Sequence, residues 1–166
     1  MLIFQLLEHP SFQRLRRISQ LGLTNLVYSG ANHSRFQHAL GAMNLMNSAI
    51  QVLRSKNISI SNEDEQAAKI AILLHDIGHG PFSHALEHSI VSDVNHEDIS
   101  TFMMNRLNEE FNGALDTAIE IFNEAIFKIA SIKDQAFEYE EEYRFTLFYP
   151  GLVSLNENTE KGYFDF

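Results

Sequence analysis

Residues 75–84 read HDIGHGPFSH, and this stretch decides the interpretation of the whole chain. Neutral imidazole is a common metal ligand and titrates near neutral pH, so histidines at this density favour a metal or catalytic site over packing. His75 and Asp76 are adjacent, and on an ideal helix they point about 100° apart. They can reach one ion only near a helix end, which Gly78 can supply. A lone histidine there is usually a cap or a core residue, but the doublet followed by Gly-His-Gly-Pro is far more specific.

The flanking sequence predicts an all-α fold. Residues 67–76, AAKIAILLHD, continue a helix that we expect to begin at Asn62, because Asn62 and Glu65 resemble a capping box. Before it, apolar residues at helical spacing predict a long helix that opens at 32–34 and extends past residue 50, followed by a loop over 56–64.

Shorter helices are expected on both sides of this pair. Residues 1–10 read like the middle of a helix rather than a signal peptide. We expect further helices at the following positions: from a Ser11 cap to near Gly22, from Gly80-Pro81, from an Asn95 cap, and over about 115–132. The acidic and aromatic residues 136–149, followed by Pro150-Gly151, do not continue the helical pattern and could form a small C-terminal β-hairpin.

Composition narrows the type of site. The 166 residues include no cysteine, so any metal must be held by histidine and carboxylate, and disulfides are excluded. This composition fits a reducing, cytoplasmic setting. The sequence has no 18-residue apolar run, so we expect no membrane span.

The charge is unevenly distributed. A net charge of −10 argues against an extended nucleic-acid surface. Residues 1–60 nevertheless carry six Lys or Arg and one acidic residue, whereas residues 61–166 carry six Lys or Arg and 21 Asp or Glu. The basic third could receive a small polyanion such as a nucleotide. For Arg14, Arg16 and Arg17, an ordinary solvated helix face explains the charge equally well.

A third metal ligand must come from another helix. His38 lies in residues 33–41, HSRFQHALG, where Gly41 would allow close helix packing. Arg35 is three residues before His38 and so shares its helix face. A guanidinium beside a metal suits a phosphate, because its planar fork can bind two phosphate oxygens.

These motifs resemble the HD phosphohydrolase superfamily, and specifically its deoxynucleoside triphosphate triphosphohydrolase branch, which includes bacterial dGTPases and the animal SAM-and-HD-domain enzymes. SRFQHALG at 34–41 and HDIGHGPFSH at 75–84 carry the resemblance, and HPSFQRLRRISQLGL at 9–23 resembles the opening helix of that branch. The match covers about residues 5–112. It implies an all-α HD-domain helical bundle.

The resemblance also implies a role for each matching residue. The metal ligands would be His38, His75 and Asp76. Arg35 would contact a substrate phosphate, Gln20 the sugar, and His96, paired with Glu97, would assist the same site. The remaining roles are catalytic and would belong to His79, His84 and Glu87, with His84 as general acid and Glu87 holding its imidazole protonated.

One part of the family pattern is missing. The family has a fourth metal ligand, an Asp on a later helix, and neither Asp116, Asp134 nor Asp165 lies in a matching phrase. We therefore expect an incomplete HD domain over residues 1–122, followed by a helix continuation and a tail of uncertain origin over residues 123–166.

The functional expectation is a metal-dependent phosphohydrolase that converts a dNTP to deoxynucleoside and triphosphate. The alternatives are an inactive HD module that binds nucleotide or metal in a regulatory role, and a fragment without function. The donor set suits Fe, Mn, Co, Ni or Zn, and Mg less well. The resemblance further suggests homo-oligomers. It leaves the base preference and the metal open.

Overall fold

A computed structural model describes residues 2–82 and 96–136 of the chain, with side chains up to residue 126. Within these residues the protein is all-α, as predicted, and its β structure is limited to an isolated bridge between Ser19 and Ser34. The α-helices are α1 (Leu2–Glu8), α2 (Pro10–Gln13), α3 (Arg35–Ser55), α4 (Asn62–Leu74), α6 (His96–Glu110) and α7 (Asp116–Ala136). Two short 3₁₀ helices, η1 (Arg14–Arg17) and η2 (Thr24–Leu26), lie between α2 and α3.

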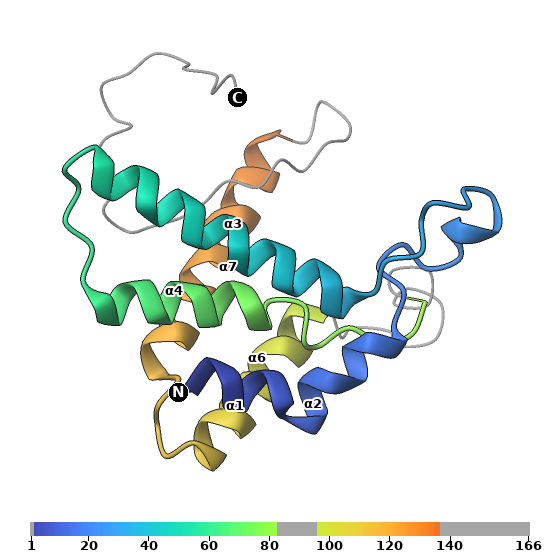
Figure 1. The fold of residues 1–166 in the computed structure, drawn as a ribbon, viewed down its shortest axis with the longest axis horizontal. Helices are drawn as coiled ribbons and strands as arrows, with labels where there is room; N and C mark the ends of the chain where they lie inside the picture. The colour runs from blue at the N-terminus through green and yellow to red at the C-terminus, as the bar shows by residue number, and fades with distance from the viewer. Residues whose placement is uncertain (1, 83–95, 137–166) are drawn as a thin grey trace.

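Helices α3 and α4 form the centre of the fold and lie side by side (Figure 1). Helix α7 packs against α4 and also contacts α6. The core between these helices and the N-terminal segment is apolar and fully buried. Its largest members are Leu6, Phe12, Leu15, Ile70, Leu73, Leu74, Ile77, Met104 and Leu115. This core fixes the C-terminal end of α4 against the first turns of α3.

The two central helices begin close to where the sequence predicts. Ser34 caps α3 with a complete capping box, in which its side chain accepts from the Gln37 amide and the Gln37 side chain accepts from the Ser34 amide. The predicted cap of α4 was wrong by one residue. Ser61, not Asn62, is the N-cap, and its hydroxyl accepts from the Asp64 amide at 3.0 Å. Asn62 is already the first helical residue.

The predicted helix from Ser11 to Gly22 was wrong. His9 caps α2, because its Nδ1 accepts from the Ser11 amide, and the chain tightens into η1 after Gln13. Ile18 is extended, and its carbonyl accepts from the Arg35 amide at 2.9 Å. This pairing with the segment before α3 draws the chain out of the helix. As a result, Gln20 lies beside the start of α3.

The last predicted helix is confirmed, since α7 covers the expected 115–132 region and continues to Ala136 without a break at residue 123. The Asn95 cap and the C-terminal hairpin lie outside the described residues, as does most of the helix expected from Gly80-Pro81. Among the described helices, none combines the length and apolarity that crossing a membrane requires.

Candidate metal centre

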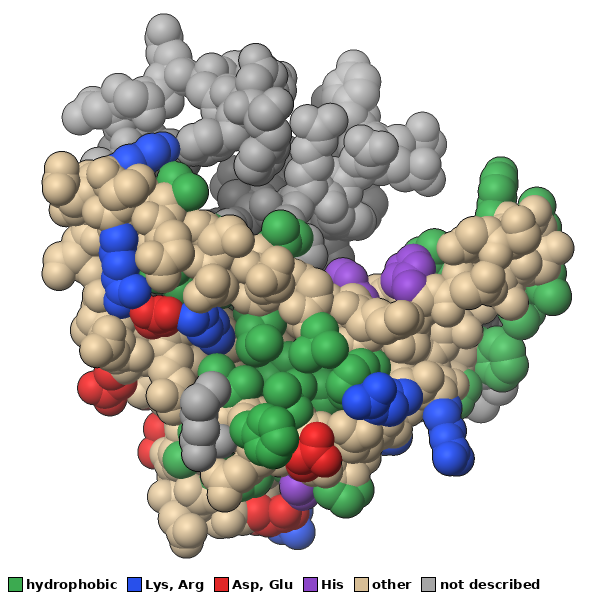
Figure 2. Space-filling model, viewed as in Figure 1, with side chains coloured by type: hydrophobic (Ala, Val, Ile, Leu, Met, Phe, Trp, Pro, Cys, Tyr) green, Lys and Arg blue, Asp and Glu red, His purple; other side chains and the backbone are tan. Residues whose placement is uncertain are grey.

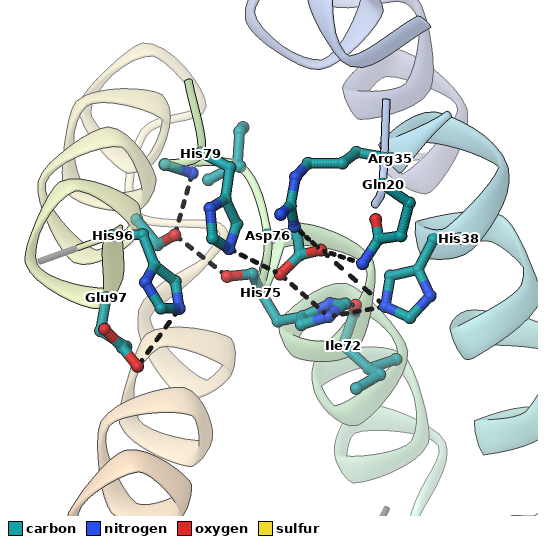
Figure 3. Close-up of polar contacts among 12 residues, drawn as sticks. Gln20, Arg35, His38, Ile72, His75, Asp76, His79, His96 and Glu97 are labelled. Atoms are coloured by element: carbon teal, nitrogen blue, oxygen red, sulfur yellow. Dashed lines mark hydrogen bonds and ion pairs between the residues drawn. The ribbon is translucent and has the colours of Figure 1, made fainter. Parts of the chain in front are cut away.

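Three side chains from α3 and the end of α4 converge on one point (Figure 3). His38 lies in the first turns of α3, His75 is the C-cap of α4, and Asp76 follows it. Nε2 of His38 lies 3.3 Å from Nε2 of His75 and 3.8 Å from Oδ2 of Asp76. Nε2 of His75 lies 3.3 Å from Oδ1 of Asp76. The expected convergence of these three residues is therefore present.

These separations fit a shared metal ion. Nitrogen and oxygen ligands bind transition metals at roughly 2.0–2.2 Å, which places neighbouring ligand atoms about 3.0–3.5 Å apart in octahedral or tetrahedral geometry. The His38–His75 and His75–Asp76 separations lie in this range, whereas the His38–Asp76 separation, which involves the other carboxylate oxygen, is longer at 3.8 Å. Both imidazoles and the carboxylate are donor types that bind divalent transition metals. The residues present thus fit a divalent cation.

The surroundings of His75 and Asp76 orient both groups. Nδ1 of His75 lies 2.6 Å from the carbonyl oxygen of Ile72, so Nδ1 carries the proton and Nε2 faces the shared point in the neutral ring. On the other side, Nη1 of Arg35 donates to Oδ2 of Asp76 at 2.6 Å. The Arg35 side chain is 2% exposed, so this ion pair is buried.

The electrostatics favour the forms that bind a cation. Burial alone would raise the pKa of Asp76, but the hydrogen bond from His79 and the charges of His75 and Arg35 hold that pKa well below its usual range. Burial lowers the pKa of His38, and the neighbouring His75 lowers it further. At neutral pH the site therefore offers an ionised carboxylate and a neutral imidazole, as metal binding requires.

Gln20 lies at the same site. Its Nε2 is 3.5 Å from Oδ2 of Asp76, and its Oε1 is buried with no hydrogen-bond partner among the described residues. The backbone pairing of Gln20 with His33 holds it there. A buried amide oxygen without a partner costs free energy, so this position suits a ligand that can donate a hydrogen bond.

His79 and His96 extend the site toward α6. Nε2 of His79 lies 3.4 Å from Oδ1 of Asp76, and its ring stacks on that of His96 with centroids 4.0 Å apart. Nε2 of His96 in turn lies 3.2 Å from Oε1 of Glu97. Burial lowers the pKa of His79, although Asp76 opposes this shift. The structure thus groups both histidines with the metal-ligand candidates, and their functional roles remain predictions.

The remaining predicted residues lie outside this group. His84 and Glu87 are outside the described residues. Asp116, on the other side of the fold, accepts from the side chain of Asn108 at 2.6 Å, and it is not part of the three-residue ligand group. Within the described residues, no further histidine, aspartate or glutamate joins the group of His38, His75 and Asp76.

Sequence reasoning missed two residues beside the site. Arg14, for which the sequence leaves polyanion binding and a solvated helix face equally open, donates to the carbonyl oxygens of Ile77 and His79. Ser100, a fully buried residue of α6, contacts the same turn. Three clustered arginines and an isolated serine carry no local signal for such contacts, because both depend on how distant segments pack.

The site opens to the surface. The side chains of His38 and His75 are 28% and 21% exposed, whereas Asp76 behind them is 9% exposed. The segment between η1 and α3, residues 18–34, projects from the body of the molecule (Figure 1). Figure 2 shows histidine side chains at the surface between the body of the molecule and this projecting segment. That segment carries exposed apolar side chains, which are Leu21, Leu23, Leu26, Val27 and Tyr28. A ligand can therefore reach the candidate metal position from solvent.

Comparison with known proteins agrees with this geometry. Residues 35–142 match the family described as the HD domain, which is more than half of the chain. The chain belongs to the HD domain family. The matched region includes His38, His75 and Asp76, so the part of the chain that matches the family also holds the candidate metal centre.

Individual proteins are similar to between half and three quarters of the chain. A phosphohydrolase from Bacteroides thetaiotaomicron has a crystal structure that is 54% identical, with a TM-score of 0.72 over 74% of this chain and 30% of that chain. The deoxynucleoside triphosphate triphosphohydrolase SAMHD1 of Danio rerio is 43% identical over 88 residues, which are 52% of this chain and 14% of that protein. An uncharacterized protein, YwfO, from Bacillus subtilis is 41% identical over 60% of this chain and 22% of its own length. The chain thus spans less than a third of each of these relatives.

Proposed function

We propose that this protein is a metal-dependent phosphohydrolase that acts on deoxynucleoside triphosphates. The observation that carries the proposal is the convergence of His38, His75 and Asp76 within 3.8 Å or less of one another. A divalent cation held there would supply Lewis-acid activation of a phosphoryl group and of water. The metal is Fe, Mn, Co, Ni, Zn or Mg, and the two imidazoles favour a transition metal over Mg.

The proposed reaction is hydrolysis at the α-phosphorus. The oxygen of a water molecule forms a bond to that phosphorus, and the bond from phosphorus to the 5′ oxygen of the sugar breaks. The departing 5′ oxygen takes up a proton and leaves as the hydroxyl of the deoxynucleoside, while the three phosphates leave together as triphosphate. We assign the proton donor to His84, with Glu87 to favour its protonated form, because histidine is the side chain used most often for proton transfer near neutral pH.

The remaining residues would bind the substrate. We assign the buried amide oxygen of Gln20 to a sugar hydroxyl, which can donate the hydrogen bond that this oxygen lacks among the described residues. Arg35 would act beside a phosphate while it holds Asp76 in place. His79 and His96 would present their stacked rings toward the same phosphates. Cationic and hydrogen-bonding groups around a phosphoryl centre stabilise the charge that develops there.

The choice of substrate class is supported by relatives. Proteins named deoxynucleoside triphosphate triphosphohydrolase SAMHD1 match 88 residues, or 52% of this chain, at 43% and 42% identity. The Bacteroides phosphohydrolase supports hydrolysis of a phosphate ester more broadly. Gln20 and Arg35 would distinguish a nucleotide enzyme from an HD domain with another substrate.

The test is to incubate the purified protein with each dNTP and Mn²⁺, Fe²⁺ or Mg²⁺ and to measure triphosphate. We expect metal-dependent release of triphosphate and deoxynucleoside in equal amounts, abolished in His38→Ala and retained in His33→Ala. Absence of product with every dNTP and metal would contradict the proposal. If dGTP with metal then raised the melting temperature without hydrolysis, the protein would instead be a nucleotide-binding regulatory module.

A further inference from the structure

The turn that follows α4 carries two of the site's side chains and has an unusual set of hydrogen bonds. Backbone carbonyls in the turn after a helix need hydrogen-bond partners when they are buried. Here the partners come from two distant segments. Arg14 of η1 binds the carbonyls of Ile77 and His79, and Ser100 of α6 binds the carbonyl of His75. The turn over 75–79 is therefore hydrogen-bonded to η1 on one side and to α6 on the other.

Arg14 makes the hydrogen bonds on the η1 side of this turn. Its Nη1 donates to the His79 carbonyl at 2.7 Å, and its Nη2 donates to the Ile77 carbonyl and lies 3.4 Å from Sδ of Met103. The side chain is half-buried, and burial lowers the pKa of its guanidinium. A planar guanidinium can hold two carbonyls at once, whereas the single ammonium group of a lysine cannot reproduce this fork.

Ser100 supplies the other side. Its hydroxyl is fully buried, donates to the His75 carbonyl at 3.0 Å and accepts from the Gly78 amide at 2.9 Å. The backbone of α6 lies so close that a Cβ on Gly78 would be 2.4 Å from the His96 carbonyl oxygen and the Ser100 nitrogen. The start of α6, with the His96 ring, is thereby locked against the turn that presents Asp76 and His79.

We infer that Arg14 and Ser100 are positioning residues that hold the Asp76 carboxylate and the His79 imidazole in their working orientation. Neither residue contacts the candidate metal position, so both act through the backbone of residues 75–79. The functional part of this inference rests on the proposed function. Its structural part, the fixed turn and its effect on metal affinity, does not.

The test compares Arg14→Met with Arg17→Met, a matched change at an exposed arginine of the same 3₁₀ helix. The probe is Mn²⁺ alone, titrated into the purified full chain. We expect Arg14→Met to weaken Mn²⁺ binding about tenfold, at the low end of the effect of losing a group that supports metal ligands. Amide hydrogen exchange at Gly78 and His79, followed by NMR, should accelerate at least tenfold. Arg17→Met should leave both quantities unchanged.

Two further variants keep the inference testable if Arg14→Met fails to fold. Arg14→Lys should lie between wild type and Arg14→Met in both measurements. Ser100→Ala should accelerate exchange of the Gly78 amide, which loses its acceptor, while the neighbouring control Thr101→Ala should not. Mn²⁺ affinity and amide exchange within twofold of wild type in Arg14→Lys and Ser100→Ala would overturn the inference.

Activity separates the functional part from simple stabilisation. If dNTPs are hydrolysed, Ser100→Ala and Arg14→Lys should lower kcat with little change in KM, even well below the melting temperature and at saturating Mn²⁺. A kcat that returns to the wild-type value under those conditions would show a merely structural role and overturn the functional part. If the wild type hydrolyses no dNTP, the proposed function fails, and exchange and Mn²⁺ affinity still decide the structural part.

Discussion

Helices α3 and α4 are joined by an arginine–carboxylate pair at each end, and the two pairs lie in very different surroundings. At one end Arg54 donates to Glu65 at 2.5 Å, and the side chains are 31% and 17% exposed. At the other end Arg35 donates to Asp76 at 2.6 Å, and the side chains are 2% and 9% exposed. The geometry is nearly the same, but burial changes what each pair can do.

The partly exposed pair has a structural role. Glu65 also binds Lys69 one turn along α4, and Arg54 donates to the Ile60 carbonyl at 2.9 Å, so this network holds the loop between the helices. The buried pair keeps a charged carboxylate next to two histidines, out of water, where charge interacts strongly with any bound cation. Helix α4 is thus anchored to α3 by a partly exposed ion pair at its start, and a buried carboxylate lies beside the candidate metal position after its end.

Breaking the buried pair should have the largest effect. In metal-free protein, Arg35→Met should lower the free energy of unfolding by about 3–5 kcal/mol, because it leaves the Asp76 carboxylate buried without its guanidinium. Arg54→Met, the matched change at the partly exposed end, should cost about 1 kcal/mol. Urea denaturation of both variants measures the difference, and equal losses would show that burial does not separate the two pairs.

A methyl group at Gly78 should have the next largest effect. In Gly78→Ala the added methyl group would collide with backbone atoms of α6, which cannot move aside as the end of a flexible side chain can. The change should cost about 1–3 kcal/mol. Gly80→Ala is the control, since a Cβ there meets nothing within 4 Å. Thermal unfolding of the two variants checks this. A Gly78→Ala protein as stable as Gly80→Ala would mean that α6 does not approach the turn so closely.

The smallest effect should come from the network of Arg54, Glu65 and Lys69. Hydrogen bonds from Lys69 and Arg54 hold the pKa of Glu65 below its usual value. A lowered carboxyl pKa stabilises the fold above the pKa of the unfolded chain, and this contribution is lost as the pH falls through the folded pKa. Glu65→Gln should therefore cost up to about 1 kcal/mol at pH 7 and less near pH 3, where the carboxyl begins to be protonated. Denaturation curves at the two pH values measure it, and a pH-independent cost would contradict the pairing.

The parts of the fold that depend on local signals were predictable. The long helix α3 begins where Ser34 and Gln37 form a capping box, and α4 ends at the His-Asp doublet before Gly78. The short helices of the N-terminal segment were not predictable, because the extended conformation of Ile18 is set by its pairing with Arg35, seventeen positions away. Tertiary pairing there outweighs the helical spacing of the apolar residues.

The candidate site divides in the same way. The convergence of His38 with His75 and Asp76 was predicted, since residue types and motif spacing carry that information. The partner of Arg35 was not predicted. The sequence suggests that Arg35 binds a phosphate, whereas in the fold its guanidinium donates to the Asp76 carboxylate. The contacts of Arg14 with backbone carbonyls could not be predicted from a motif, because every residue has a backbone carbonyl and the sequence does not mark which one accepts.

Metal content tests the central claim most directly. Wild type, His75→Ala and His33→Ala would be purified alike, loaded with Mn²⁺ or Fe²⁺, desalted and analysed for bound metal. The account predicts about one equivalent in wild type and in His33→Ala, and almost none in His75→Ala. Equal metal content in His75→Ala and wild type, or none in wild type, would contradict a centre built from His38, His75 and Asp76.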